Sequence, residues 1–564
     1  MRDRLPPAAR LDRRERLPAA PASETSLAAA ELRGRTPPWG RSAPLLVVAL
    51  MAGGLWLRVH ALAAEGFGDD EVHKWLAARR YLTGEIGGDD VEHPMLMKAL
   101  IAVVLALAGE RWAPETITRL PNALAGGASV LVVALLARRL FGRAAALWAS
   151  ALAAASVTLV GYQRMAKEDT LLGLFLMVVC LCAAEAKAAA DDGRAAAQTR
   201  WEQGGAAALG AMLASKYFFF LTPIPLLAYG WIRGTNTAWR IPARRWLRLV
   251  GLAFLIWAGL DWTPFLPSTW EYARSYIPGG QTVHGSLFFM GHTYHNLVQY
   301  GPAGTPPWYY VVFTFVKLAP ATLLFALGGL AVALWHRLPA HRVVLAWIGV
   351  WFAVHSASGS KWGRFYISVL PAFLILAGHA AALVLERARA GGGAPFLAAA
   401  SATGILLVGG EARAALTHAP HYRLYVSPLG GGDGNVPWFF PHCDFYDTGF
   451  REAIQEVSAR SERGAEVCSE IDWVSRLYAE RAGRMDLVHT LLRRGRACRA
   501  APFCYVLVQP GRIYLHNADA LARLSRRVPW HTVRVRGQEA VQVYRLTGGE
   551  SPFPDDAAMA LIAR

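Results

Sequence analysis

The stretch Gly66-Phe67-Gly68-Asp69-Asp70-Glu71-Val72-His73, with its continuation to His93-Pro94 and Lys98, decides how we interpret this chain. It directly follows the first apolar run, residues 43–64. Three adjacent acids beside a membrane are costly unless water, a ligand or a cation meets them. This cluster is therefore the first candidate for chemistry, although acids of this kind can also simply solvate the end of a loop.

The overall composition indicates a multispan membrane protein. The 564 residues are 54% hydrophobic and only 18% charged, with a mean hydropathy of +0.26, which is too apolar for one soluble domain. The net charge is +17, but most Lys and Arg lie between apolar runs, as the positive-inside rule expects. Nucleic acid is therefore not an expected partner, whereas the lipid bilayer is.

Apolar runs predict an all-α membrane domain over residues 43–410, after a basic, Pro-rich tail at 1–42 that we expect to be disordered and cytoplasmic. About eleven spans are expected, with the C-terminus outside. They are residues 43–64, 120–140, 144–161, 170–186, two short spans within 204–230, 250–265, 309–335, 343–356, 365–385 and 395–409.

The run at 94–109 leaves two topologies open, because it is short and contains Lys98. If it spans the membrane, Arg138 and Arg139 face outside. If it is a juxtamembrane or re-entrant helix, these arginines are cytoplasmic and residues 162–169 share the outer side with Asp70. The positive-inside rule favours the second topology. The spacing of apolar and basic residues over 72–82 predicts a helix on the membrane surface.

The composition changes near residue 411 to that of a soluble domain. We expect a linker at 411–434, a small extracytoplasmic α/β domain at 435–547 and a tail at 548–564. Patterns predict helices at 450–460 and 518–524, strands at 465–471 and 503–508, and a hairpin of 531–535 with 540–544. Four cysteines lie in this region, and an oxidising compartment favours disulfides among them, with three pairings open: Cys443, Cys468, Cys498 and Cys504.

Under the favoured topology, ionisable residues from five segments share one membrane face. A carboxylate there can take a proton from an attacking hydroxyl, and cations can bind a phosphate and stabilise the charge that develops on it. The residues are Asp70, Glu71, His93, Lys98, Arg164, Asp169, His284, His292, His295, Lys361 and Arg364.

Simpler explanations exist for several of these residues. Lys361 and Arg364 could extend to lipid headgroups, and His93-Pro94 could only start a helix. Lys216, at a break between short spans, is expensive if unpaired but could also meet a headgroup. His284, His292 and His295 match no strong ligand pattern, so a divalent metal stays open and no cofactor is certain.

The motifs resemble those of a known family. Asp70-Glu71 and His93-Pro94-x-x-x-Lys98 resemble the Asp-Glu and His-Pro-Pro-x-x-Lys motifs of protein O-mannosyltransferases, and Arg164-x-x-x-x-Asp169 is similar to a later motif of that family. Further matches are Arg119-Leu120-Pro121, Arg138-Arg139-Leu140-Phe141-Gly142, Lys361-x-x-Arg364-Phe365-Tyr366, which is also similar to the lipid A aminoarabinose transferases, and Tyr425-x-x-Pro428-Leu429-Gly430-Gly431. Met95 and Ser427 depart from the family pattern.

The resemblance implies a GT-C fold and an inverting transfer from a polyprenyl-phosphate sugar outside the cytoplasm. It implies that Asp70 is the base, with Asp169 nearby. The residues facing the donor phosphate would be Lys98, Arg164, Lys361 and Arg364, and further candidates for substrate binding are Glu71, His93, Lys216 and His284.

The sequence thus predicts a glycosyltransferase of the bacterial inner membrane. It would move a mannose-like hexose to Ser or Thr of exported proteins, its partners being the lipid-linked sugar and an acceptor protein or glycolipid. The same chemistry on a lipid or cell-envelope polysaccharide is the nearest alternative. A transporter or scaffold is the rival from another class, but a transporter keeps its ionisable residues near mid-span and shows paired halves, neither of which is seen in the sequence.

Overall fold

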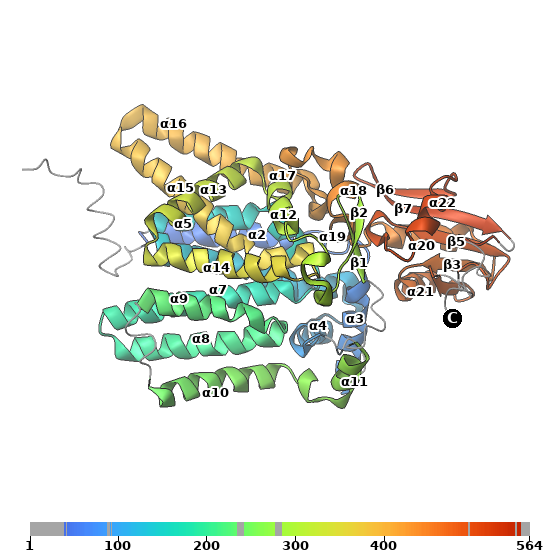
Figure 1. The fold of residues 1–564 in the computed structure, drawn as a ribbon, viewed down its shortest axis with the longest axis horizontal. Helices are drawn as coiled ribbons and strands as arrows, with labels where there is room; N and C mark the ends of the chain where they lie inside the picture. The colour runs from blue at the N-terminus through green and yellow to red at the C-terminus, as the bar shows by residue number, and fades with distance from the viewer. Residues whose placement is uncertain are drawn as a thin grey trace, which may run out of the picture.

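The computed structural model describes residues 39–40, 42–86, 91, 93–233, 242–276, 285–493, 497–547 and 550–553. His284 and most of the two predicted tails lie outside the described residues. Within them the chain forms a helical bundle whose long helices run side by side, with a small sheet domain at one end (Figure 1). This confirms the predicted combination of a helical membrane domain with a C-terminal α/β part.

The bundle consists mainly of helices that match the predicted apolar runs. They are α2 (Ala43–Val59), α4 (Met95–Ala108), α5 (Pro114–Ala155), α6 (Val157–Gln163), α7 (Asp169–Asp191), α8 (Ala195–Ser215), α9 (Pro223–Arg233), α10 (Ala243–Leu260), α12 (Tyr309–Lys317), α13 (Pro320–His336), α14 (Pro339–Ala357), α15 (Leu370–Ala390), α16 (Gly393–Gly404) and α17 (Gly410–His418).

Helix α5 consists of two segments that meet at Gly142, whose φ of +85° only glycine adopts readily. Arg58 contacts both segments. Its guanidinium donates to the Ala153 carbonyl at 2.9 Å, and its Nε would lie 2.9 Å from a Cβ added at Gly126. The segments therefore fold back beside each other, as expected for separate spans at 120–140 and 144–161.

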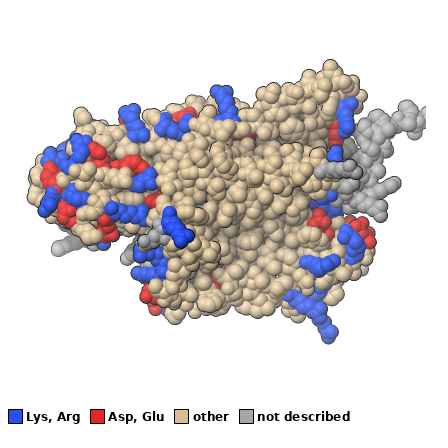
Figure 2. Space-filling model, turned by 180° about the vertical axis from the view of Figure 1, so that it is seen from behind, with Lys and Arg blue, Asp and Glu red and all other residues tan. Residues whose placement is uncertain are grey.

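Four described helices are long and apolar enough to cross a membrane, or up to five if the bent pair α13 and α14 counts as one span. The expected eleven spans are not reached by this measure, because α2 is shorter, α5 is counted once although it holds most of two expected spans, and the run at 204–230 breaks after α8. The number eleven therefore stays a prediction. Seen from behind, a broad band with few charged residues separates two charged ends (Figure 2), as an integral membrane protein requires.

Helix α3 (Asp69–Tyr81) begins with the three acids and lies where the bundle meets the sheet domain (Figure 1). Acids in the first turn of a helix are stabilised by its dipole. The Glu71 carboxylate also accepts the Gly68 backbone N–H at 2.9 Å, which satisfies a group that would otherwise be unpaired at the helix start.

The connections on this side of the bundle are short elements. They are η1 (Gly109–Arg111), η2 (Phe219–Leu221), η4 (Thr263–Phe265), α11 (Pro267–Tyr276), the antiparallel pair β1 (Ser286–Phe289) and β2 (His292–His295), η5 (Val298–Ala303) and η6 (Gly363–Ser368). The segment that leads to the sheet domain holds η8 (Tyr422–Leu424), η9 (Pro428–Gly430), η10 (Asp433–Asn435), α18 (Val436–Phe439) and α19 (Pro441–Phe445).

The C-terminal domain is a five-stranded sheet in the order β4-β3-β5-β7-β6. Strand β3 is parallel to β4 and β5, while β7 is antiparallel to β5 and β6. The predicted helices at 450–460 and 518–524, the strand at 503–508 and the hairpin are all confirmed. The elements are α20 (Phe450–Arg460), β3 (Glu466–Ser469), α21 (Asp472–Arg481), β4 (Val488–Leu491), β5 (Phe503–Val508), η11 (Pro510–Arg512), α22 (Ala518–Leu524), β6 (His531–Val535) and β7 (Gln538–Thr547).

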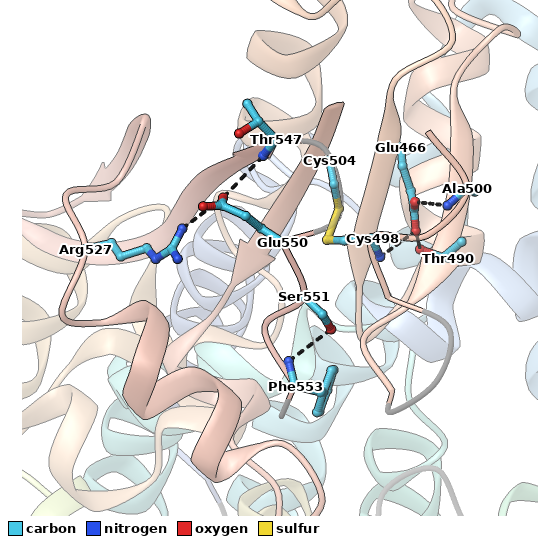
Figure 3. Close-up of a disulfide and its surroundings, with 10 residues drawn as sticks. All are labelled: Glu466, Thr490, Cys498, Ala500, Cys504, Arg527, Thr547, Glu550, Ser551 and Phe553. Carbon is cyan, nitrogen blue, oxygen red and sulfur yellow. Dashed lines mark hydrogen bonds and ion pairs between the residues drawn. A yellow bond between two sulfur atoms is a disulfide. The ribbon is translucent and has the colours of Figure 1, made fainter. Parts of the chain in front are cut away.

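One disulfide closes the loop before β5, between Cys498 and Cys504 (Figure 3). The Glu466 carboxylate accepts the backbone N–H groups of Cys498 and Ala500, at 2.9 and 2.7 Å, and so holds this loop against β3. Cys443 and Cys468 are buried free thiols. The sequence left three ways of pairing the four cysteines open, and the structure contains one disulfide, Cys498–Cys504.

Candidate active site around Asp70

The three acids at the start of α3 each pair with a cation from a different part of the chain. Asp69 pairs with Arg512 at 3.0 Å, Asp70 with Lys167, and Glu71 with Arg119 at 2.5 Å. The Asp70 side chain is 28% exposed, whereas those of Asp69 and Glu71 are 8% and 0% exposed. Asp70 is therefore the one of the three that a substrate can reach.

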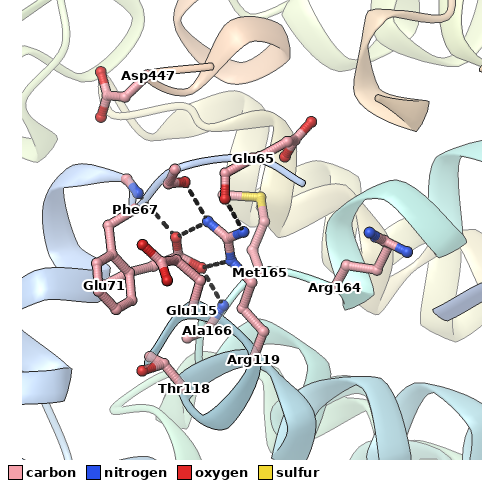
Figure 4. Close-up of polar contacts among 12 residues, drawn as sticks. Glu65, Phe67, Glu71, Glu115, Thr118, Arg119, Arg164, Met165, Ala166 and Asp447 are labelled. Atoms are coloured by element: carbon pink, nitrogen blue, oxygen red, sulfur yellow. Dashed lines mark hydrogen bonds and ion pairs between the residues drawn. The ribbon is translucent and has the colours of Figure 1, made fainter. Parts of the chain in front are cut away.

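Glu71 is surrounded by protein donors (Figure 4). It accepts from Arg119 Nε at 2.9 Å and from the backbone N–H of Ala166 at 2.9 Å, in addition to its bond with Gly68. Burial would raise the pKa of Glu71, but the Arg119 guanidinium and the backbone donors hold that pKa below its usual value. These contacts show Glu71 joining α3, α5 and the loop before α7, with no position left for a substrate.

Arg119 completes this connection. It donates to the backbone carbonyls of Leu62, Glu65 and Gly66, at 2.8, 2.8 and 2.6 Å. The acidic segment after α2 is thus held to α5 by one buried guanidinium.

Asp169, the first residue of α7, meets two of the predicted cations. Lys216 lies 2.6 Å from one carboxylate oxygen, and Arg364 Nε lies 3.6 Å from the other. Lys216 sits in the break after α8, where its backbone is extended, and Arg364 belongs to η6. The structure therefore brings together Asp169, Lys216 and Arg364 from three distant segments.

The cations in this region crowd one another. Burial and the Arg364 guanidinium hold the pKa of Lys167 well below its usual value, and Lys216 acts in the same direction. Burial also lowers the pKa of Lys216, with Asp169 opposing and Arg364 adding to the effect. An anion bound among these three cations would relieve this repulsion, since an opposite charge favours the protonated form of a lysine.

Lys361 lies three residues before Arg364 but is fully buried. Its ammonium donates to the carbonyl of Thr305 at 2.8 Å and to that of Ser358. Burial lowers the pKa of Lys361 to about 8. The guanidinium of Arg364 differs, because it stacks near the rings of Trp362 and Phe365 and its side chain is 17% exposed.

Arg164 is committed to the end of α2. Its guanidinium donates to the carbonyls of Leu57, Arg58, His60 and Ala61, which are among the carbonyls that the helix end leaves unpaired. These four contacts give Arg164 a structural role at the helix end.

Lys98 and His93 lie at the start of α4. The Lys98 ammonium donates to the His93 carbonyl at 2.8 Å. Burial raises the pKa of the Glu168 carboxyl, but Lys74 and then His93 act against burial and hold that pKa well below its usual value. Lys74 and Glu168 form a buried ion pair of 3.0 Å. The predicted grouping of these motifs at one end of the bundle is consistent with these contacts.

Among the described residues, no three or more His, Cys, Asp or Glu side chains gather in a way that could hold a metal ion. His292 and His295 lie at the two ends of β2. A divalent metal therefore gains no support from the part of the chain that the structure describes.

Sequence reasoning did not identify two residues beside the acids. Lys167, the ion partner of Asp70, lies within the matched segment 164–169 and could have been found as a cation two residues before Asp169. Arg512 lies 443 residues after Asp69, and no local pattern marks it.

One family model matches part of the chain. Residues 92–262 match the family model described as dolichyl-phosphate-mannose-protein mannosyltransferase. No curated protein sequence matches the chain.

Three groups of solved structures are similar to this one. ArnT from Cupriavidus metallidurans bound to undecaprenyl phosphate is 17% identical, with 88% of this chain and 97% of that chain covered and a TM-score of 0.49. The Archaeoglobus fulgidus oligosaccharyltransferase tethered with an acceptor peptide is 12% identical, with 80% and 64% covered and a TM-score of 0.50. The S. cerevisiae Pmt1-Pmt2 complex is 21% identical, with 44% and 36% covered and a TM-score of 0.31.

The likeness at a TM-score of 0.50 concerns the fold alone, and the matched family segment contains His93, Lys98, Arg164, Asp169 and Lys216. These findings confirm the resemblance seen in the sequence: in its matched segment and in its fold, this integral membrane protein is similar to the GT-C glycosyltransferases that take sugars from polyprenyl phosphates.

Proposed function

We propose that this protein transfers a sugar from a polyprenyl-phosphate donor to a hydroxyl acceptor at the outer face of the bacterial inner membrane. In the reaction, Asp70 accepts the proton of the acceptor hydroxyl, whose oxygen attacks the anomeric carbon of the sugar. The bond from that carbon to the donor phosphate breaks, the configuration inverts, and polyprenyl phosphate leaves with the electron pair.

One observation carries this proposal. Asp70 is the accessible acid in a row of three, and its ion partner Lys167 belongs to a group of three cations whose mutual repulsion a bound anion would reduce. A hydroxyl is a poor nucleophile at neutral pH, and a positioned base contributes a rate factor of about 10²–10⁴. Asp69 and Glu71 cannot compete for this role, since each is buried in its own ion pair. Asp169, which is bound by Lys216, positions the cations instead.

Arg364 and Lys216 are the proposed donor-phosphate ligands, with Lys361 adding charge from the same loop. A guanidinium and an ammonium stabilise the phosphate as its charge grows in the transition state. An apolar cavity of about 440 Å³ lies among α7, α8, α9 and α10, lined by Leu213 and Thr222 on either side of the break at Lys216 and by Trp246, Phe254 and Trp257. Its composition suits a prenyl chain whose phosphate lies at Lys216.

For the donor and acceptor we propose a mannose-like hexose and the Ser or Thr hydroxyls of exported proteins. The description of the matched family model, which names dolichyl-phosphate-mannose and a protein acceptor, supports this choice. A lipid or envelope polysaccharide would present the same hydroxyl chemistry to Asp70.

The test uses purified full-length protein with polyprenyl-phosphate mannose carrying a radioactive sugar. Ser/Thr-containing peptides, glycolipids and envelope polysaccharide serve as separate acceptors, and the Asp70→Asn variant is the control. We expect labelled peptide from the native protein and none from the variant. Label only on lipid or polysaccharide would show that the acceptor is not a protein. No label on any acceptor, with donor binding intact, would overturn the proposed function.

A further inference from the structure

The C-terminal domain reaches the first turn of α3 through one arginine. Arg512, which is buried, donates from Nη1 to Asp69 at 3.0 Å and from Nε and Nη2 to Asp447 at 2.9 and 2.5 Å. Asp447 in turn accepts the backbone N–H of Asp69 at 3.0 Å. Both the backbone and the side chain of the residue before Asp70 are therefore held by this domain.

Other contacts hold the same segment from the same side. The Tyr478 hydroxyl accepts the Phe67 N–H at 2.6 Å and donates to Glu115 at 2.8 Å. Arg451 donates to the carbonyls of Ala63 and Ala64, at 2.9 and 2.8 Å. From residue 63 to residue 69, the approach to Asp70 lies against the C-terminal domain.

The architecture of the domain explains why Arg512 points here. Parallel strands β3 and β5 end at Ser469 and Val508, at the same edge of the sheet, and η11 with Arg512 follows β5 directly. Gln509, the residue after β5, also donates to Asp447 at 3.1 Å. Binding groups commonly gather outside the carboxyl ends of parallel strands, and in this domain that edge faces α3.

We infer that Arg512 is a positioning residue for Asp70, and that the C-terminal domain is thereby a part of the catalytic centre rather than a separate acceptor module. The inference rests on the proposed role of Asp70 as base. Arg512 fixes the first turn of α3, and its charge offsets the repulsion that Asp69 and Glu71 exert on the Asp70 carboxylate. A base that must be ionised to accept a proton depends on this offset.

Charged groups from several elements act on Asp70, on its acidic neighbours or on its ion partner. They are Asp69 and Glu71 on α3, Arg119 on α5, Lys167 in the loop before α7, Arg364 on η6, and Arg512 and Asp447 from the C-terminal side. Removing Arg512 leaves Asp69 and Asp447 with one fewer cation, so the proton affinity of all three carboxylates, Asp70 included, should rise.

The test measures the protonation of Asp70 without relying on transfer. Purified full-length protein is treated with a water-soluble carbodiimide and an amine at a series of pH values, and labelling at Asp70 is followed by peptide mass spectrometry, because protonated carboxyls react faster. For Arg512→Gln we expect the labelling midpoint to move up by about one pH unit, because a cation that pairs with the neighbouring Asp69 is lost. The kcat for transfer should fall about tenfold at neutral pH, with the donor KM unchanged.

Two variants separate positioning from a general loss of structure. Arg512→Lys keeps the charge and should keep the midpoint near that of the native protein. Arg484→Gln removes an arginine of the same domain that pairs with Asp486 at 2.8 Å and should overlay the native curve. If Arg512→Gln does not fold, the double variant Arg512→Gln/Asp447→Asn removes one charge of each sign and is compared with Asp447→Asn alone. The midpoint of the double variant should lie above that of Asp447→Asn, since the two differ only in the Arg512 charge.

The inference is overturned if the folded Arg512→Gln protein gives the native midpoint, if the double variant in its place gives the midpoint of Asp447→Asn, or if Arg484→Gln shifts the native midpoint equally. This outcome is distinct from failure of the proposed function. If the native protein transfers no sugar, the function falls, while the labelling curves still decide whether Arg512 acts on Asp70.

Discussion

At the scale of single residues, three neighbouring acids of similar chemistry take different roles because their partners differ. Glu71 is enclosed by a guanidinium and two backbone N–H groups, Asp69 is held by Arg512, and Asp70 keeps an accessible edge. Breaking a buried ion pair leaves an uncompensated charge in the interior. Substitutions at the three positions should therefore damage different properties.

The pair Asp70→Asn and Glu71→Gln tests this division. Asp70→Asn keeps the shape of the side chain and removes the base, so we expect a folded protein that binds donor but loses transfer by at least about 10²-fold. Glu71→Gln leaves Arg119 without its carboxylate and should cost about 3–5 kcal/mol in the free energy of unfolding. Single-turnover transfer and thermal unfolding of both variants provide the comparison. Normal transfer by Asp70→Asn would remove the base from the mechanism.

A second prediction at this scale concerns the pH dependence at Lys361. Burial lowers its pKa to about 8 from the usual 10.5, so its ammonium is charged below pH 8 and loses its proton above. The donor phosphodiester keeps one negative charge over this range. Donor affinity should thus fall above pH 8, by up to about tenfold per pH unit, whereas Lys361→Arg should bind donor equally across the range because arginine stays charged.

The same shift has a consequence for stability with a defined sign. Between pH 8 and 10.5 the unfolded lysine holds its proton while the folded lysine does not, so Lys361 contributes a free energy of unfolding that rises with pH in this window.

The predicted fall in donor affinity above pH 8 would be checked by calorimetric titration of the donor at pH 7, 8, 9 and 10. Overlapping isotherms for the native protein would mean that Lys361 has only a structural role.

At the scale of elements, the start of α3 depends on a close approach of the Gly68 backbone to the ring of Tyr446. Gly68 precedes the helix, and a Cβ added there would lie 2.1 Å from Cε1 of Tyr446. Tyr446 lies at φ +40°, in the left-handed region, and is followed directly by Asp447. The contact therefore connects the helix start with the carboxylate that binds Arg512.

Replacement of Gly68 by Ala should force Tyr446 away and disturb Asp447. We expect a loss of about 1–3 kcal/mol in the free energy of unfolding from overpacking, together with a strong loss of transfer. Gly53→Ala in α2 is the matched control, because a Cβ there meets nothing within 4 Å and alanine favours a helix interior. Unfolding midpoints and transfer rates of both variants would be compared, and equal effects at the two positions would disprove the packing argument.

At the scale of the whole molecule, the bundle separates two ends of different character. Asp169 begins α7, and Glu185, which lies 4.0 Å from Arg139, follows sixteen residues later. A helix rises about 1.5 Å per residue, which places the two ends roughly 24 Å apart. Arg139 and the proposed site therefore lie near opposite faces of a membrane.

Single-cysteine labelling in intact cells tests the orientation. A membrane-impermeant maleimide should modify cysteines placed at Asp70 and Arg364 from outside and should spare those placed at Arg138 and Arg244, as the positive-inside rule predicts. Permeabilised cells, in which all four positions should react, serve as the control. Labelling at Arg138 from outside would mean that the run at 94–109 spans the membrane and that residues 162–169 do not share the outer side with Asp70.

The sequence by itself determined much of the local structure. Apolar runs predicted the long helices, Gly142 separated two of the predicted spans, and the patterns of the C-terminal part predicted α20, α22, β5 and the final hairpin with bounds close to those observed. The motifs also predicted Asp70, Asp169 and Arg364 as site residues, and the break in the run at 204–230 added Lys216 as a candidate; the structure places Lys216 and Arg364 beside Asp169. These properties depend on periodicity and short-range chemistry, which neighbouring residues carry.

Only the tertiary structure decided which acid is accessible and what each cation does. Arg164 and Arg364 are equivalent cations in the sequence, yet one binds the end of α2 and the other meets Asp169. Arg512 reaches Asp69 across 443 residues, so no window of sequence could connect them. The strength and role of an ionic group depend on its burial and its partners, and both arise only when distant segments pack together.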